Sequence, residues 1–143
     1  ILLNQDSFEN LMELREMTEA GMMRLAIEHH EDKELDELES ILGEMKKALE
    51  LKENRVDTFF EADNRFHDKI AEMGKNPMAD KINKVVRSLT HAVRYQTVSA
   101  MILSGKSDKL LDTHVQLFNA IRERDDTDLS EKVRSSYFED ELG

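Results

Sequence analysis

The chain has 143 residues, the size of one ordinary domain, and 39% of them are hydrophobic, which is enough to form a core. Its formal net charge of -11 would repel a phosphate backbone or an anionic membrane, so this chain alone is not expected to bind nucleic acid. The absence of cysteine excludes disulfides, thiolate metal sites and a cysteine nucleophile.

Targeting signals are missing from the sequence. No signal peptide is recognisable in these 143 residues, and no apolar run approaches the roughly 20 residues that a membrane span needs. Together with the lack of cysteine, this predicts a cytoplasmic protein. Because the chain opens at Ile1 and not at a methionine, we expect a fragment that lacks an N-terminal part.

The composition and the spacing of apolar residues predict an all-α fold. Glycine (5) and proline (1) are rare, whereas leucine, methionine, glutamate and lysine are common, and these residues favour helix. No strand-like alternation and no internal repeat is present. We predict six helices, over residues 7–30, 33–54, 57–73, 77–103, 108–124 and 129–142.

The first two predicted helices are amphipathic. Ser7 is the expected N-cap of the first helix, and the second has glutamate and lysine on its outer faces. Apolar positions at steps of three and four define both stripes. The stripe of the first helix includes Leu11, Leu14, Met22 and Leu25, and that of the second includes Leu35, Leu38, Ile41, Leu42, Met45 and Leu49.

A glycine and a proline separate the third and fourth predicted helices. Asp57 is the expected N-cap of the third, whose apolar residues are Phe59, Phe60, Ala62, Phe66 and Ile70. Gly74 suits the end of this helix and Pro77 the first turn of the next. Along the fourth helix run Met78, Ile82, Val85, Leu89, Ala92 and Val93.

The last two predicted helices complete a bundle. Leu110, Leu111, His114, Leu117, Phe118 and Ile121 form the inward stripe of the fifth, and the sixth begins near Leu129. Because the joints between helices are short, neighbouring helices should be antiparallel. The sequence therefore predicts an antiparallel helical bundle.

Asp63 and His67 are the sharpest local feature. They are four residues apart, so they share one face of the third helix, beside its apolar stripe. A carboxylate and an imidazole facing a core are costly unless they are paired or bound to a metal. A simple hydrogen-bonded pair and a metal site both fit this spacing.

His114 strengthens the metal interpretation. It lies within an apolar stripe, so the helical pattern directs it at the core. A lone core histidine is more often only hydrogen-bonded, but two histidines and an aspartate on adjacent helices form the start of a metal site with nitrogen and oxygen ligands.

Arginines are the candidate anion-binding residues. Arg15 lies beside the stripe of the first helix, and its guanidinium could either pair with Glu19 on the surface or bind a carboxylate within a cavity. Arg87 and Arg94 offer similar charges. No catalytic residue is identified, because the chain has no serine in an elbow motif and no pair of Glu-x-x-His motifs on two helices.

Several segments together resemble the FCD family, the C-terminal effector domain of FadR-type GntR transcription regulators. These segments are Glu13-Leu14-Arg15 with Glu19, residues 60–67 (FEADNRFH), residues 74–77 (GKNP), residues 113–121 (THVQLFNAI) and Arg124-Asp125. The resemblance covers nearly the whole chain, residues 11–142. It implies a six- or seven-helix antiparallel bundle with a central ligand cavity.

The resemblance also implies a divalent metal bound through one aspartate and three histidines. Asp63, His67 and His114 match three of these ligands, but the fourth position is Ser136, and serine is a poor ligand for zinc-like ions. Zinc, nickel or manganese could still bind with water or an effector completing the shell. Alternatively, this chain binds its effector without metal.

The family further implies a regulator and not an enzyme. We expect a winged helix-turn-helix domain before Ile1, DNA contact only through that domain, a homodimer, and a small carboxylate effector that contacts Arg15 and Arg94. Residues 1–143 would then be one effector-binding and dimerisation domain. The two competing hypotheses are a metal-dependent helical-bundle enzyme and a dimerisation module without ligand.

Overall fold

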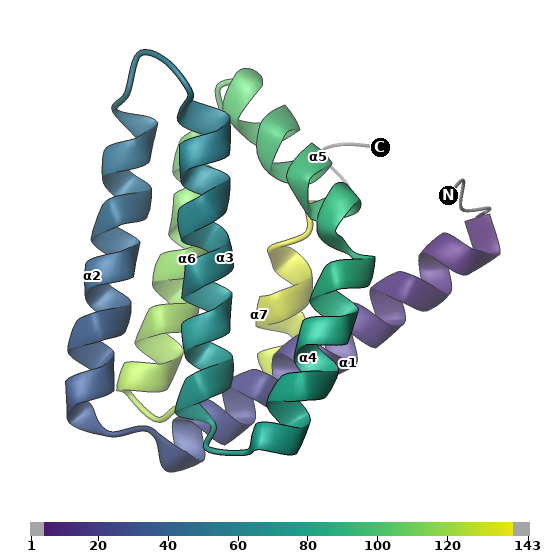
Figure 1. Ribbon diagram of the computed structural model, residues 1–143, viewed down its shortest axis with the longest axis vertical. Helices are drawn as coiled ribbons and strands as arrows, with labels where there is room; N and C mark the ends of the chain where they lie inside the picture. The colour runs from purple at the N-terminus through teal and green to yellow at the C-terminus, as the bar shows by residue number, and fades with distance from the viewer. Residues whose placement is uncertain (1–4, 139–143) are drawn as a thin grey trace.

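Residues 5–138 fold into seven helices. The computed structural model describes residues 5–138, and this part of the chain contains no strand (Figure 1). The all-α class and the six- or seven-helix bundle are thereby confirmed. The helices are α1 (Gln5–His29), α2 (Asp32–Leu49), α3 (Arg55–Met73), α4 (Pro77–Leu89), α5 (His91–Leu103), α6 (Ser107–Arg122) and α7 (Leu129–Ser135).

Helix α3 lies at the centre of the arrangement and packs against α1, α2, α4 and α5. On one side α2, α3 and α6 run alongside one another, and on the other α4 and α5 close the bundle (Figure 1). Helix α1 crosses the base, where it packs on α3, α4, α6 and α7. Residues of α1, α3, α4 and α6 can therefore meet in the interior.

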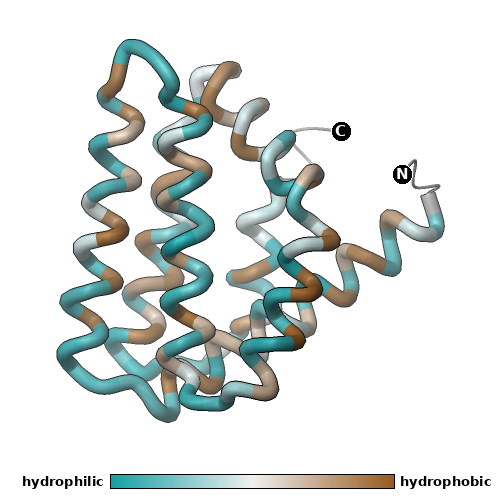
Figure 2. Tube along the Cα trace, viewed as in Figure 1, coloured by the Kyte–Doolittle hydropathy of each residue, from teal (hydrophilic) through white to brown (hydrophobic). Residues whose placement is uncertain are grey.

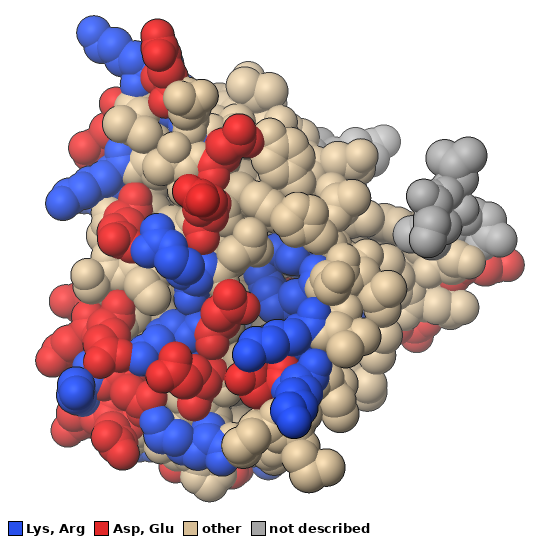
Figure 3. Space-filling view, in the orientation of Figure 1, with Lys and Arg blue, Asp and Glu red and all other residues tan. Residues whose placement is uncertain are grey.

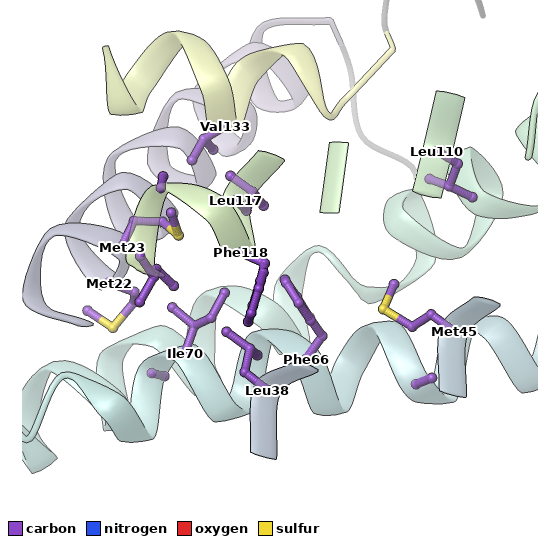
Figure 4. Close-up of a cluster of buried hydrophobic side chains, with 14 of the residues drawn as sticks. Met22, Met23, Leu38, Met45, Phe66, Ile70, Leu110, Leu117, Phe118 and Val133 are labelled. Atoms are coloured by element: carbon purple, nitrogen blue, oxygen red, sulfur yellow. The ribbon is translucent and has the colours of Figure 1, made fainter. Parts of the chain in front are cut away.

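The apolar core joins these helices. Leu38 of α2, Phe66 and Ile70 of α3 and Phe118 of α6 point toward one another in the close-up (Figure 4). The alternation of apolar and polar positions along the tube in Figure 2 shows how each helix contributes one face. Methionines of α1 and α2 fill gaps in this core, as their unbranched side chains do elsewhere.

The joint between α3 and α4 matches its predicted chemistry. Asn76 caps α4, because its side chain accepts a hydrogen bond of 3.0 Å from the Ala79 backbone N–H, and Pro77 occupies the first turn. Gly74 ends α3 with an ordinary φ of -73°. Glycine is required there by close packing, since a Cβ would lie 2.9 Å from the Cβ of Leu25.

Four predicted boundaries are wrong. Helix α1 already begins at Gln5 and α3 at Arg55, so Ser7 and Asp57 lie inside helices and do not cap them. Helix α2 ends at Leu49, before the predicted residue 54, and α7 ends at Ser135. The predicted sixth helix extended to residue 142, and its residues 139–142 lie outside the described residues.

The predicted long helix over residues 77–103 is also wrong, because it is divided at Thr90 into α4 and α5. The Thr90 hydroxyl donates a 2.9 Å hydrogen bond to the Val86 carbonyl and accepts one of 3.1 Å from Arg94 Nε. A threonine that bonds back to the preceding turn bends a helix. The division directs Arg94 into the interior, where it is buried.

Helix α4 turns its polar face toward the interior and its apolar face toward the surface, the opposite of an ordinary amphipathic helix. Its apolar residues Met78, Ile82, Val85 and Leu89 are between 59% and 77% exposed, although their spacing is that of a core stripe. The inward face of α4 and the start of α5 instead contains Asn83, Arg87, Thr90 and Arg94, all buried. A polar interior and an uncovered apolar surface therefore belong to the same segment.

None of the helices in residues 5–138 is both long enough and apolar enough to cross a bilayer.

The contacts of Glu34 predict that its contribution to the free energy of unfolding depends on pH. Its carboxylate accepts a 3.0 Å bond from the Glu31 N–H, which caps α2, and lies 2.5 Å from the Lys75 ammonium. Burial by itself would raise the pKa of Glu34, but Lys75 and the Glu31 amide lower this pKa below its usual value. The ion pair therefore stabilises the fold above the usual glutamate pKa and weakens as pH falls through the folded-state pKa.

We expect Glu34→Gln, which keeps the cap, to lower the free energy of unfolding by about 1 kcal/mol at pH 7 and by much less at about pH 3. Urea titrations at both pH values test this. The exposed Glu39→Gln variant of the same helix is the control. An equal loss at the two pH values would contradict the assignment to the Lys75 ion pair.

Candidate effector and metal site

Asp63, His67 and His114 meet in the interior of the bundle. Asp63 and His67 are one turn apart on α3, and His114 projects from α6. The Asp63 Oδ1 atom lies 2.8 Å from His114 Nε2 and 3.2 Å from His67 Nε2. One donor atom from each residue lies within 4.8 Å of the others, a spacing compatible with shared coordination of a single ion.

The protonation states of these residues follow from their contacts. Burial would raise the pKa of Asp63, but His114 and then His67 hold that pKa well below its usual value. Burial and the positive charge of Arg87 lower the pKa of His67, whereas Asp63 raises that of His114 despite burial. Asp63 is therefore ionised and His67 neutral at pH 7, which are the states that a metal ligand requires.

The surroundings of His114 suit a ligand role. Its Nδ1 donates to the Leu110 carbonyl at 2.9 Å, which orients Nε2 toward Asp63, where it donates to the ionised Oδ1 at 2.8 Å. A metal bound here would take the place of the Nε2 proton. The rings of Phe59 and Phe66 pack edge-on against the imidazole and keep it dry. Ser136, at the fourth family position, donates its hydroxyl to the Val133 carbonyl at 2.6 Å. Three residues thus fit a metal, and the fourth is engaged within its own chain segment.

Arg15 forms a buried ion pair instead of the surface pair that its spacing also allowed. Its Nε donates to Glu19 Oε1 at 3.1 Å, and both side chains are less than one-tenth exposed. The guanidinium lies over the ring of Tyr137, 3.9 Å from its centroid, and the Tyr137 hydroxyl donates to Glu19 Oε2 at 3.2 Å. Nη1 of Arg15 is buried and has no partner within residues 5–138.

Arg87 and Arg94 continue this polar cluster. Arg87 donates to Glu19 Oε1 at 3.4 Å and to Asn64 Oδ1 at 3.1 Å. Arg94 donates to the same Asn64 oxygen at 2.7 Å and to the Arg87 carbonyl at 2.8 Å. Burial, together with the neighbouring charge of Arg87, lowers the pKa of Arg94 to about 10, so this side chain remains charged at pH 7.

The cluster holds more positive than negative charge. Three buried guanidinium groups, those of Arg15, Arg87 and Arg94, face two buried carboxylates, those of Glu19 and Asp63. Burial raises the pKa of Glu19, but Arg15, His67 and Arg87 lower it overall, so both carboxylates are ionised. An excess of buried positive charge inside a chain of net charge -11 needs an anion or a release of protons.

A small cavity lies next to both groups. Its polar wall is formed by Glu19, His67, Asn83 and Arg87, and its apolar wall includes Met22 and Val133. The volume open to the centre of a water molecule is about 10 Å³, close to what one water occupies. The cavity thus joins a candidate metal ligand to an arginine of the cation-rich cluster.

Sequence reasoning missed Glu19 as an interior residue, and missed Asn64, Asn83 and Tyr137 altogether. A sequence signal for Asn83 did exist. Asn83, Arg87, Thr90 and Arg94 follow one another at steps of four, three and four, so they lie on one polar face of a helix. Tyr137 gave no such signal, because the sequence pattern predicts a continuous helix there, whereas α7 ends at Ser135.

The other three histidines lie apart from the cluster. His30 bonds to the Ala26 carbonyl, His91 contacts the ring of Phe60, and His29 lies close to the Glu28 carboxylate.

The comparisons with known proteins identify the family of the chain. The FCD domain family matches residues 10–137, which include every residue of the polar cluster. The galactonate operon transcriptional repressor of Escherichia coli (strain K12) is 30% identical over 115 residues, covering 80% of this chain. The chain spans about half the length (48%) of that curated relative. It therefore belongs to the FCD domain family of FadR-type GntR transcription regulators.

Proposed function

We propose that this chain is the effector-binding and dimerisation domain of a transcription regulator and that its effector is a small carboxylate. The observation that carries this proposal is the excess of guanidinium groups in the interior. Arginine binds carboxylates through paired, charge-assisted hydrogen bonds, which are strong in a dry site. Family membership favours a regulator over the competing enzyme hypothesis.

The relative supports the same class of ligand. Its name connects it with galactonate, a small organic anion. The Arg15 Nη1 group has no partner in the described chain and is ready to donate to such an anion. Arg94, which already has three acceptors, acts mainly through its charge and by holding Asn64 and Arg87 in place.

Asp63, His67 and His114 would hold a divalent ion such as zinc, nickel or manganese. When bound, the ion supplies a positive charge that attracts an effector carboxylate. The chain's own residues keep the ligands dry and orient His114 through the Leu110 carbonyl. Elemental analysis of the protein purified without a histidine tag tests this: one ion per chain supports the site, and none after soaking and dialysis rules it out.

The regulatory mechanism that we propose is a population shift. The cavity lies between α1, α3, α4, α6 and α7 and has room for only one small group, so an acid that places one of its groups there moves several helices apart. An acid that fits one arrangement of these helices better will increase its population. The position of α1 then changes relative to the winged helix-turn-helix domain that we propose precedes it in the whole protein.

We further propose that the exposed apolar stripe of α4 is the homodimer interface. Uncharged side chains cover much of α5 and the outer side of α4, with Lys and Arg along the side of α4 that faces α3, whereas charges of both signs crowd over α2 and α3 (Figure 3). Asp80 is the only acidic residue between Pro77 and Leu103, a segment that also contains Lys81, Lys84, Arg87 and Arg94. Two copies of a chain with net charge -11 can therefore approach here with the least repulsion.

Ile82→Glu is expected to convert the dimer to a monomer, because a buried carboxylate at the centre of an interface costs about 2 kcal/mol or more. Sedimentation analysis at micromolar concentration measures the change. Leu51→Glu, at an exposed position after α2, is the control. A native chain that sediments as a monomer, or an unaffected Ile82→Glu dimer, would exclude this interface.

The regulatory proposal is tested on the whole regulator and its operator DNA. A small carboxylate that binds this chain is expected to change the affinity for the operator by at least about tenfold, in line with ordinary allosteric coupling. Binding of the acid with no change in DNA affinity would leave a ligand-binding domain but would overturn its regulatory role.

A further inference from the structure

Asn83 is a buried polar residue whose side-chain amide is not fully hydrogen-bonded. It lies on the inward face of α4, one turn before Arg87, and is only 2% exposed. Its amide nitrogen has no hydrogen-bond partner anywhere in residues 5–138. Buried polar groups are almost always hydrogen-bonded, so an unpaired one that lines a cavity indicates a missing partner.

The cavity next to Asn83 has room for one small polar group. It is close to the size of a single water molecule, and Glu19, His67 and Arg87 also line it. The carboxylate of Glu19 already accepts bonds from Arg15, Arg87 and Tyr137, and a carboxylate has about four acceptor positions. One acceptor position of Glu19 is thus left.

The chemistry of these walls is selective. The amide nitrogen of Asn83 and the guanidinium of Arg87 only donate hydrogen bonds, whereas the ionised carboxylate of Glu19 only accepts them. A group between them must accept from one side and donate to the other. A hydroxyl group does both, whereas a methylene group does neither and would leave the walls unpaired.

We propose that this cavity holds a hydroxyl of the effector, that Asn83 donates to its oxygen while Glu19 accepts its proton, and that Asn83 selects hydroxy acids over the corresponding acids without the hydroxyl. The inference rests on the proposed function, because the carboxylate of the same effector is held by the arginines. Since Arg87 is one turn from Asn83, the hydroxyl lies on a carbon close to that carboxylate.

The test compares three pairs of acids that differ only in the α-hydroxyl: lactate with propionate, malate with succinate, and galactonate with its 2-deoxy analogue. Titration calorimetry measures their affinity for the native chain and for Asn83→Leu. The control Asn10→Leu changes an exposed asparagine of α1. Asn83→Ala is a second variant in case leucine is too large for the fold.

In the pair that binds, we expect the native chain and Asn10→Leu to prefer the hydroxy acid by about tenfold or more. Asn83→Leu should lose this preference and bind the acid without the hydroxyl within about threefold of native. Its melting temperature without ligand should equal or exceed that of the native chain, because an unpaired buried amide has been removed.

Equal affinity of the native chain for both members of every binding pair would overturn the role of Asn83 and leave the proposed function standing. A preference that survives in Asn83→Leu and Asn83→Ala would do the same, and the cavity would then hold only a structural water. Failure of every acid to bind the native chain would overturn both proposals.

Discussion

Replacing Asp63 with alanine is expected to lower the free energy of unfolding by about 3–5 kcal/mol. The substitution removes one of two carboxylates that balance a buried cluster containing Arg15, Arg87 and Arg94. It also leaves His114 without the hydrogen bond that raises the pKa of its imidazole. Breaking a buried charge pair leaves the partner uncompensated, which accounts for the size of the loss.

Urea unfolding at pH 7 measures this loss, with Asp68→Ala as the control. Asp68 is exposed on the same helix, so its replacement should change the free energy of unfolding by less than about 0.5 kcal/mol. If the native chain carries a metal ion, its content should fall to background in Asp63→Ala only. A loss below about 1 kcal/mol would show that Asp63 is not the counter-charge of the cluster.

Replacing Arg87 with methionine is expected to weaken binding of the effector acid by about 100-fold. Arg87 lines the cavity and supplies one of the three guanidinium groups that exceed the two carboxylates. Glu19 would keep its bonds to Arg15 and Tyr137. Because the remaining buried charges are balanced, stability without ligand should change little.

Calorimetric titration with the best-binding acid and urea unfolding without ligand provide the two measurements. Arg24→Met removes an exposed arginine of α1 that pairs with Glu28, and it should leave both unchanged. Stability and affinity thus respond differently to the two main substitutions: Asp63→Ala impairs the fold, whereas Arg87→Met impairs binding. A large loss of stability in Arg87→Met would contradict the idea that the arginines outnumber the buried carboxylates and that the surplus positive charge binds the ligand.

Local spacing was sufficient to predict the cluster of Asp63, His67 and His114. Asp63 and His67 share a helical face at four residues apart, and His114 lies in the apolar stripe of another helix, so both helices direct these side chains inward. The structure brings the three together. The resemblance to the family placed the fourth position at Ser136, whose hydroxyl is bonded within its own segment.

The reversed faces of α4 could not be predicted in the same way. An amphipathic pattern identifies an apolar face, but it does not state whether that face contacts the same chain or another one. Ile82 and Val85 therefore suggested a core position, although both are more than half exposed. The bend at Thr90 depends on side-chain bonding to Val86 O and Arg94, which composition and periodicity do not encode.

Tyr137 illustrates a further limit. Its contacts with Arg15 and Glu19 join residues more than one hundred positions apart in the sequence. Burial and the nearby Glu19 carboxylate raise the pKa of its phenol, so it remains a hydrogen-bond donor at any ordinary pH. Such a contact arises because the segment after α7 packs on α1, and no local sequence pattern predicts it.

Calorimetric titration of the native chain with a panel of small carboxylates and their uncharged amides tests most directly whether this interior binds an anion. The buried excess of arginine predicts that at least one acid binds with one molecule per chain and that its amide does not. Binding of the amide with equal affinity, or no binding of any acid, would contradict the account that this interior is an anion site.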